Sequence, residues 1–205
     1  MDQAQSSSNS GLGAQYGAMD DKSKSTISDW VGDMVALESH IEEALDHQLA
    51  MKNDNPQAKA AIQRFHDRTK ANRDRLKAYQ EQVGSTGGNP VKAVGATILG
   101  KAAGIIDKIR AEGVSKSLRD DYTAFNHACI GYTMLHATAV SLGDQRTADV
   151  AAQGMRHHAM CVQEINHLIG EVVVWELGND DHQIVNRQAG DQNRKKVDEI
   201  WKETA

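Results

Sequence analysis

The segment MRHHAMCVQEINH, residues 155–167, gathers side chains that are able to bind a metal ion. It contains three histidines, one cysteine and one glutamate within thirteen positions. Glu164 and His167 are three residues apart, which is the spacing at which one helix presents a carboxylate and an imidazole to a metal in di-iron helical bundles. Whether this chemistry is possible depends on which of these groups face the neighbouring helices.

The apolar residues of the same segment indicate which groups point inward. They recur at spacings of three and four, as in an amphipathic helix, and they are Met155, Val162, Ile165 and Leu168. His158 falls on this apolar stripe, whereas Glu164 and His167 fall beside it. We therefore expect a partly solvated polar flank and not a central metal site. A zinc ion held by His158 with His127 or His136 of the preceding helix stays open as an alternative, without a third ligand in evidence.

The composition narrows the classes of protein to which the chain can belong. Its 205 residues, 40% of them hydrophobic, suffice for one well-buried domain. A formal net charge of −5 argues against a nucleic-acid partner. The only two cysteines, Cys129 and Cys161, are typical of a reducing compartment, and we expect inert thiols, with a redox pair as the alternative. The N-terminal sequence lacks the regions of a signal peptide and no apolar run is long enough to span a membrane, so we expect a cytoplasmic protein.

Long segments without proline, with apolar residues at helical spacing, predict an all-α fold. We expect a disordered N-terminal arm over residues 1–25, a four-helix bundle over residues 26–177 and a C-terminal tail over residues 178–205. The last helical pattern, NRKKVDEIWKET, covers residues 193–204 of that tail. We expect its apolar side chains to pack back on the bundle or onto a neighbouring subunit.

Capping residues and prolines predict where the helices begin and end. Ser28 or Asp29 is expected to cap the first helix, which should stop before the sequence NDNP. Pro56 suits the first turn of the second helix. We expect the third helix to start near Leu118 and the fourth to follow Asp144.

The connection between the second and third helices is long and rich in small residues. Residues 91–106 read VKAVGATILGKAAGII, and Gly100 and Gly104 have the spacing that allows two helices to approach closely. We expect a short helix that lies across the bundle. Contact with a second copy of the chain is one alternative, and binding at a membrane surface is the other.

Two of the expected helices carry motifs of a known family. The first reads LESHIEEAL over residues 37–45, similar to the A-E-x-x-L-x-x-A-L sequence of bacterial ferritin-like stress-response proteins. The second reads AKAAIQRFHDRTKANRDRLKAYQEQVG over residues 58–84 and aligns without gaps with a family helix containing E-T-x-x-H-x-x-R-L. The resemblance, over roughly residues 28–170, implies a ferritin-like four-helix bundle with one long crossover. It also implies that Glu38 stands at the position of an iron ligand.

Other ligand positions implied by the resemblance hold residues of a different kind. Arg68 and Asn72 replace the glutamate and the histidine of the second-helix motif. Later acidic positions of the family fall on residues without a carboxylate, namely Phe125, Ala128 and Val162. A single inward acid cannot compensate the charge of two iron ions in a desolvated core, so we expect no metal and no cofactor.

These replacements suggest that an ion pair takes the structural place of the iron. We expect Arg68 to pair with Glu38, with Asn72 and His158 completing the hydrogen bonds of a residual polar centre. If a metal is nevertheless bound, its candidate ligands are Glu38, His158, His127 and His136.

Three functions are compatible with this pattern. We expect first a non-catalytic protein with a structural or partner-binding role, linked to bacterial stress responses by the resemblance, that forms a homodimer or homo-oligomer or binds another protein. The second is an iron- or zinc-binding oxidase or iron-handling protein with a remodelled ligand set. The third is a membrane-surface or assembly factor that acts through residues 91–106. Neither a Ser–His–Asp grouping nor a phosphate-binding loop is evident, so we expect no catalytic residues.

Overall fold

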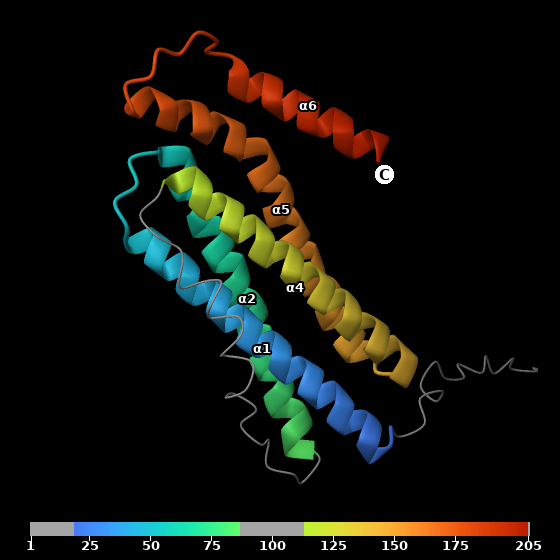
Figure 1. The fold of residues 1–205 in the computed structure, drawn as a ribbon. Helices are drawn as coiled ribbons and strands as arrows, with labels where there is room; N and C mark the ends of the chain where they lie inside the picture. Colours follow the sequence, from blue (N-terminus) through green and yellow to red (C-terminus); the bar gives the residue numbers. More distant parts are fainter. Residues whose placement is uncertain (1–18, 87–112, 205) are drawn as a thin grey trace, which may run out of the picture.

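The computed structural model describes residues 19–86 and 113–204 of the chain, residues 82–86 by their backbone alone. In these two ranges the chain forms five helices and no strand, which confirms the expected all-α class (Figure 1). The helices are α1 (Asp21–Ala50), α2 (Pro56–Thr86), α4 (Val114–Leu142), α5 (Gln145–Asn179) and α6 (Ala189–Glu203). The short helix expected within residues 91–106 and most of the expected N-terminal arm lie outside the described residues.

The helices pair as two antiparallel hairpins. α1 packs against α2 and α4 packs against α5, while contacts of α1 with α4 and of α2 with α5 join the two hairpins into a bundle (Figure 1). α2 and α4 run in the same direction, so the end of α2 and the beginning of α4 lie at opposite ends of the bundle. α6 follows α5 and turns back to pack against it.

The first helix begins earlier than its sequence predicts. Asp20 caps α1, because its carboxylate accepts a hydrogen bond of 2.8 Å from the backbone N–H of Ser23. Ser28 and Asp29, which were the expected caps, lie inside the helix. The buried stripe starts at Ile27. The residues of the first turns are polar and show no apolar periodicity, so the sequence pattern does not indicate that they are helical.

The other helix boundaries follow the capping chemistry closely. α1 ends before the NDNP sequence and α2 starts at Pro56, as predicted, with Asn55 accepting a hydrogen bond from the N–H of Ala58. α5 follows Asp144 as predicted, with Asp144 as its cap, and Gly143 ends α4 in the left-handed region with a φ of 78°. α4 itself begins at Val114, one turn before its predicted start.

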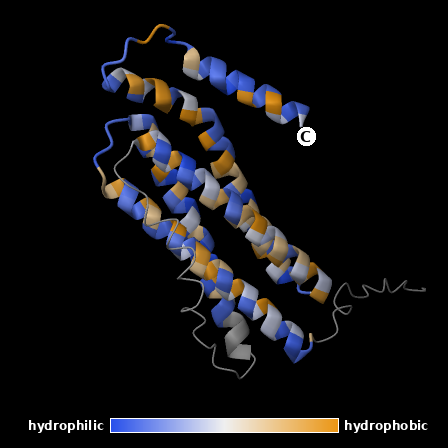
Figure 2. Cartoon of the chain, viewed as in Figure 1, coloured by the Kyte–Doolittle hydropathy of each residue, from blue (hydrophilic) through white to orange (hydrophobic). Residues whose placement is uncertain are grey.

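Apolar residues fill the bundle in two clusters along its axis. One cluster contains Phe65 and Phe125, whose rings meet edge to face with centroids 5.3 Å apart. Along α1 this cluster includes Ile41, whereas the other cluster includes Met34, and Glu38 lies where the two meet. Figure 2 shows hydrophobic and hydrophilic residues interleaved along the helices, which is the pattern of amphipathic helices in a bundle.

Two glycines bring α6 close to α5. An added Cβ on Gly170 would lie 2.7 Å from the side-chain oxygen of Asn193, and one on Gly190 would lie 2.5 Å from the carboxyl carbon of Glu171. Gly190 is also the only residue of α6 that is buried. α6 does turn back onto α5. The apolar side chains of the tail that were expected to pack on the bundle or onto a neighbouring subunit do not pack on the bundle, because Val185, Ile200 and Trp201 are half exposed or more. No described helix combines the length and the apolar content that crossing a membrane requires.

Candidate functional site

The centre of the bundle is a polar cluster built around one buried carboxylate. Glu38 of α1 is 0% exposed. Its Oε1 atom accepts a hydrogen bond from the hydroxyl group of Tyr132 on α4, and it lies 2.8 Å from Nε2 of His158 on α5. Burying a carboxylate costs several kcal/mol unless donors replace its water, and these two side chains do so for Oε1. Oε2 of Glu38 and Nδ1 of His158 are buried without a protein partner.

Aromatic rings fix the imidazole of His158 beside this carboxylate. The ring of Tyr132 stacks on the imidazole with centroids 5.8 Å apart, and the ring of Phe125 lies 5.4 Å away on centroids. His158 is itself buried, as the apolar stripe of its helix predicts. These contacts hold the imidazole with Nε2 directed at Glu38.

Tyr132 stays protonated in this environment. Burial, together with the charge of Glu38, raises the pKa of its hydroxyl far above the ordinary value. Its ring occupies space left by Gly154 on α5, where an added Cβ would lie 2.2 Å from the ring. Tyr132 is a member of the site that the sequence reasoning missed, although its position on the inward stripe of α4 and its need for a hydrogen-bond partner were signals.

Arg68 does not pair with Glu38, so this part of the predicted centre is wrong. Its Nη1 atom lies 3.0 Å from a carboxylate oxygen of Glu164 on α5 and 3.7 Å from the sulfur of Cys161. Arg64 binds the other oxygen of Glu164. The guanidinium reaches the edge of the bundle because a partly solvated ion pair avoids the desolvation that pairing at the centre would require.

Asn72 also lies apart from Glu38. Its Oδ1 atom accepts a hydrogen bond from Arg75 at 3.4 Å and lies 2.7 Å from Nδ1 of His157, which is half-buried. Burial and the positive charge of Arg75 lower the pKa of His157. The structure therefore brings Glu38 and His158 together and directs Arg68 and Asn72 to other partners.

The remaining candidate ligands are spread over α4. His127 is exposed and His136 is half-buried, and neither belongs to a group of three potential ligands in the described ranges. Burial raises the pKa of Cys129, and it raises the pKa of Cys161 to about 12, so both side chains are thiols and poor metal ligands at neutral pH.

The donor set at the centre does not fit a carboxylate-bridged di-iron site. It offers one carboxylate, Glu38, and one imidazole, whereas two iron ions need several acidic ligands for charge compensation. Two of the positions that the resemblance assigns to acids hold Phe125 and Ala128, which are fully buried apolar residues. What this arrangement does chemically is to hold a carboxylate, a phenol and an imidazole in one fixed geometry.

Comparison with known proteins places the chain in a family. Residues 24–176, three quarters of the chain, match the family described as "Domain of unknown function (DUF892)". The chain belongs to the DUF892 family. The match covers nearly all of α1, all of α2 and α4 and nearly all of α5, including the three residues of the polar centre, and it ends before α6.

A solved structure shares the fold of this DUF892 chain. The crystal structure of a protein from Xanthomonas campestris pv. campestris superposes with a TM-score of 0.61 at 17% sequence identity, covering 78% of this chain and 99% of that one. At this identity the likeness concerns the fold alone. No curated protein matches the sequence.

Proposed function

We propose that this DUF892 chain is a ferritin-like four-helix bundle that has exchanged its di-iron ligands for a hydrogen-bonded centre made of Glu38, Tyr132 and His158. In this proposal it has a non-catalytic, structural or partner-binding role in the cytoplasm, linked to bacterial stress responses through the family resemblance. The observation that carries the proposal is the set of partners around Glu38, whose Oε1 atom meets a hydroxyl group and an imidazole of the protein itself.

The connectivity of the helices supports the ferritin-like part of the proposal. Two antiparallel hairpins in which the second and third long helices run in the same direction need one long crossover, and ferritin-like bundles have this topology. The 17%-identical crystal structure supports the same fold without adding an activity.

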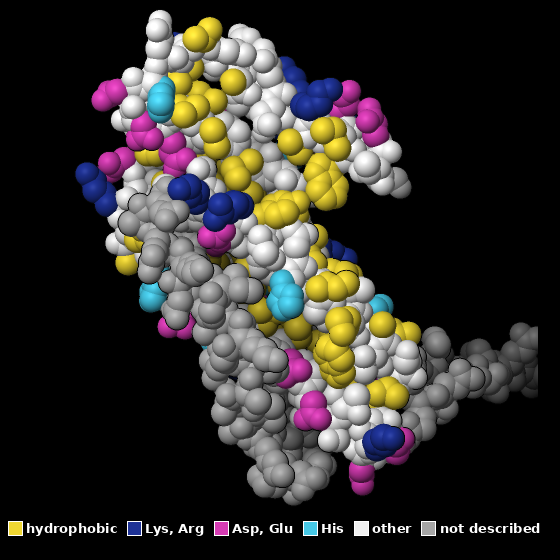
Figure 3. Space-filling model, viewed as in Figure 1, with side chains coloured by type: hydrophobic (Ala, Val, Ile, Leu, Met, Phe, Trp, Pro, Cys, Tyr) yellow, Lys and Arg dark blue, Asp and Glu magenta, His cyan; other side chains and the backbone are white. Residues whose placement is uncertain are grey.

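The surface supports a role in binding a partner. Figure 3 shows hydrophobic side chains along the face formed by α4 and α6. Ile130 and Met134 lie one turn apart on α4 and are about half exposed, as are Ile200 and Trp201 at the end of α6. Exposed aromatic and aliphatic side chains of this size are typical of binding surfaces, and a second copy of the chain is the partner we favour.

Iron loading of the Glu38→Gln variant and of the native chain tests the proposal. Both proteins are incubated with ferrous iron without oxygen and desalted, and bound iron and oxygen consumption after re-aeration are then measured. We expect no iron that depends on Glu38 and equal oxygen consumption in the two proteins. At least one iron per chain that disappears in Glu38→Gln would contradict the proposal, because it would make Glu38 a ligand.

A further inference from the structure

The seam between α1 and α2 holds a second group of potential metal ligands, outside the buried polar centre. Glu42 and Asp46 lie one turn apart on α1, and His66 faces them from α2. One ligand atom from each of the three lies within 4.8 Å of the other two. Within residues 19–86 and 113–204 no other three His, Cys, Asp or Glu side chains are gathered so closely.

Both nitrogens of the His66 ring face carboxylates. Nε2 lies 3.0 Å from Oδ1 of Asp46 and 3.9 Å from Oε1 of Glu42, whereas Nδ1 lies 3.2 Å from Oδ1 of Asp67. A neutral imidazole carries one N–H, so it cannot donate to carboxylates on both sides. A second proton or a metal ion at Nε2 resolves this conflict. An imidazole whose far nitrogen donates to a carboxylate is the usual arrangement of a metal-bound histidine.

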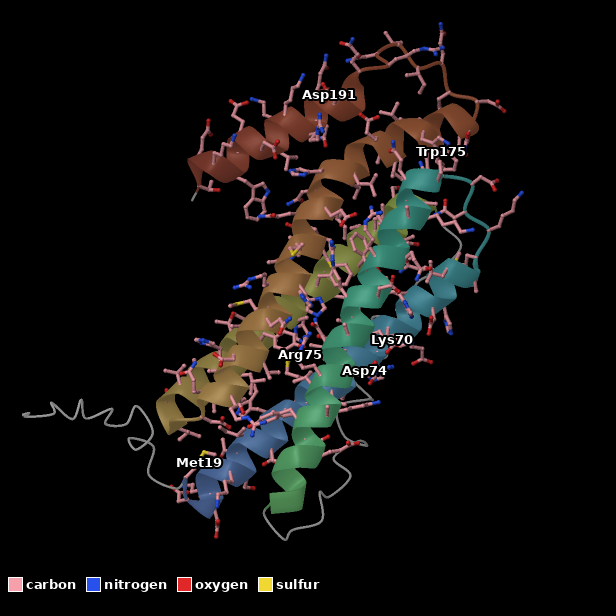
Figure 4. The ribbon with its side chains drawn as sticks, turned by 180° about the vertical axis from the view of Figure 1, so that it is seen from behind. Met19, Lys70, Asp74, Arg75, Trp175 and Asp191 are labelled. Carbon is pink, nitrogen blue, oxygen red and sulfur yellow. The ribbon has the colours of Figure 1, made fainter. Side chains whose placement is uncertain are left out.

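The neighbouring charges leave one oxygen of Glu42 available. Arg73 of α2 binds Oε2 of Glu42 and also pairs with Asp74 at 2.7 Å, so the guanidinium is already neutralised by a second acid. Lys70 lies on the same side of α2 as Asp74, as Figure 4 shows. With Asp46 and Asp67 added, three carboxylates surround the single imidazole of His66, and the seam keeps an excess of negative charge.

Two of the three candidate ligands are nearly buried, and the third is exposed to solvent. The side chains of Glu42 and His66 are only 10% and 13% exposed, while that of Asp46 is 61% exposed. A zinc ion with ligand distances of about 2.0–2.2 Å needs neighbouring ligand atoms about 3.3–3.6 Å apart. Nε2 of His66 lies 3.9 Å from Oε1 of Glu42 and 3.0 Å from Oδ1 of Asp46, so shifts of a few tenths of an ångström at both carboxylates bring these two distances to this spacing. The exposed side chain of Asp46 leaves a path by which solvent reaches the ion.

We propose that Glu42, Asp46 and His66 bind one Zn²⁺ ion that links α1 to α2, with Asp67 orienting the imidazole. One nitrogen and two carboxylate oxygens suit zinc, and water completes the tetrahedron. An imidazole ligand disfavours magnesium and calcium, which prefer oxygen ligands. This site is independent of the polar centre at Glu38 and of the function proposed above.

Zinc titration of the full chain tests this inference. The protein is freed of metal with a chelator, dialysed, and titrated with zinc chloride in a calorimeter, and its unfolding temperature is measured with and without the ion. We expect one Zn²⁺ per chain and a rise of the unfolding temperature by several degrees. Asp46→Asn changes an exposed side chain, so the variant folds, and we expect it to weaken zinc binding at least about tenfold.

A second histidine–aspartate pair provides the matched control. Nε2 of His167 lies 2.9 Å from Oδ1 of Asp198 on the surface, without a third ligand beside it. We expect His167→Ala and Glu38→Gln to bind zinc as the native chain does. Absence of binding, unchanged binding in Asp46→Asn, or loss of binding in either control would overturn the inference. Loss of zinc in Glu38→Gln alone would place the ion at the centre.

Discussion

Glu38 and Asp121 are both buried acids, but their surroundings differ. Tyr132 and His158 both approach Oε1 of Glu38, whereas Oε2 of Glu38, like the second oxygen of Asp121, has no protein partner. Asp121 on α4 accepts one hydrogen bond of 2.7 Å from Gln48, and its second oxygen has no protein partner. Burial accordingly raises the pKa of Asp121 to about 7, since a poorly solvated carboxylate favours its neutral form.

This raised pKa predicts a pH dependence of stability. The fold favours protonated Asp121, so the stability that this proton provides is fully present below about pH 4 and is lost as the pH rises to about 7. Asp121→Asn keeps an acceptor for Gln48 and removes the charge. We expect the variant to be more stable than the native chain by roughly 2–4 kcal/mol at about pH 8, and equally stable at about pH 4. Urea unfolding at the two pH values measures the difference.

Asp120 is a suitable control for this experiment, because it is adjacent in sequence but pairs with Arg119 near the surface. We expect Asp120→Asn to show a much smaller gain at high pH than Asp121→Asn, because the charge of Asp120 raises the pKa of Asp121 less than burial does. An equal gain for Asp121→Asn at both pH values would mean that the charge of Asp121 is not the cause.

The sequence predicts the direction of a side chain better than its partner. The apolar stripes placed Glu38 and His158 inside the bundle, and they do meet there. Arg68 was assigned to Glu38 because both were expected to face inward. Its long side chain instead reaches Glu164 at the edge, since helical periodicity fixes the direction of the Cβ atom and not the position of the charged end.

At the scale of the helices, Gly154 determines how closely α4 and α5 approach. The ring of Tyr132 fills the space where a Cβ of Gly154 would lie. A glycine inside a helix costs about 1 kcal/mol relative to alanine, so its presence indicates that close packing is worth more here.

We expect Gly154→Ala to destabilise the bundle by about 1–3 kcal/mol, because the new methyl group forces Tyr132 away from Glu38. Gly178 of the same helix has no atom within 4 Å of an added Cβ and serves as the control. Gly178→Ala should be neutral or slightly stabilising. Thermal unfolding of both variants compares them, and a stabilised Gly154→Ala variant would show that the helices can separate without cost.

Helix boundaries were predictable where a residue has a unique role. Pro56, Gly143 and Asp144 each mark a boundary that the structure reproduces. The start of α1 was missed because several Ser, Thr and Asp residues between Asp20 and Asp29 are equally good caps. The structure identifies Asp20 by the hydrogen bond that its carboxylate accepts from the N–H of Ser23, and the sequence gives no sign of that choice.

At the scale of the whole molecule, the bundle and the C-terminal helix contribute unequally. The family match ends at residue 176, and α6 buries only Gly190. The described contacts of α6 are mainly with α5, through the two glycine positions and the His167–Asp198 pair.

A chain that ends at Asp180 should therefore keep its fold. We expect the same helical bundle by circular dichroism, apart from the missing helix, and an unfolding temperature lowered by a few degrees, because little apolar surface is lost. Zinc binding should also persist, because the proposed ligands lie on α1 and α2. A truncated chain that loses cooperative unfolding would show instead that α6 is an integral part of the core.

The donors to Glu38 come from the opposite hairpin of the bundle, and this affects how the two hairpins align. The acid belongs to the α1–α2 hairpin, whereas Tyr132 and His158 both belong to the α4–α5 hairpin. Hydrophobic side chains alone would tolerate halves that slide past one another by a helical turn. Such a misaligned arrangement would separate the carboxylate of Glu38 from its donors and leave it among apolar side chains, at a cost of roughly 3–5 kcal/mol. The buried carboxylate of Glu38 thus favours one alignment of the two hairpins along the bundle axis, which their apolar side chains alone would not select.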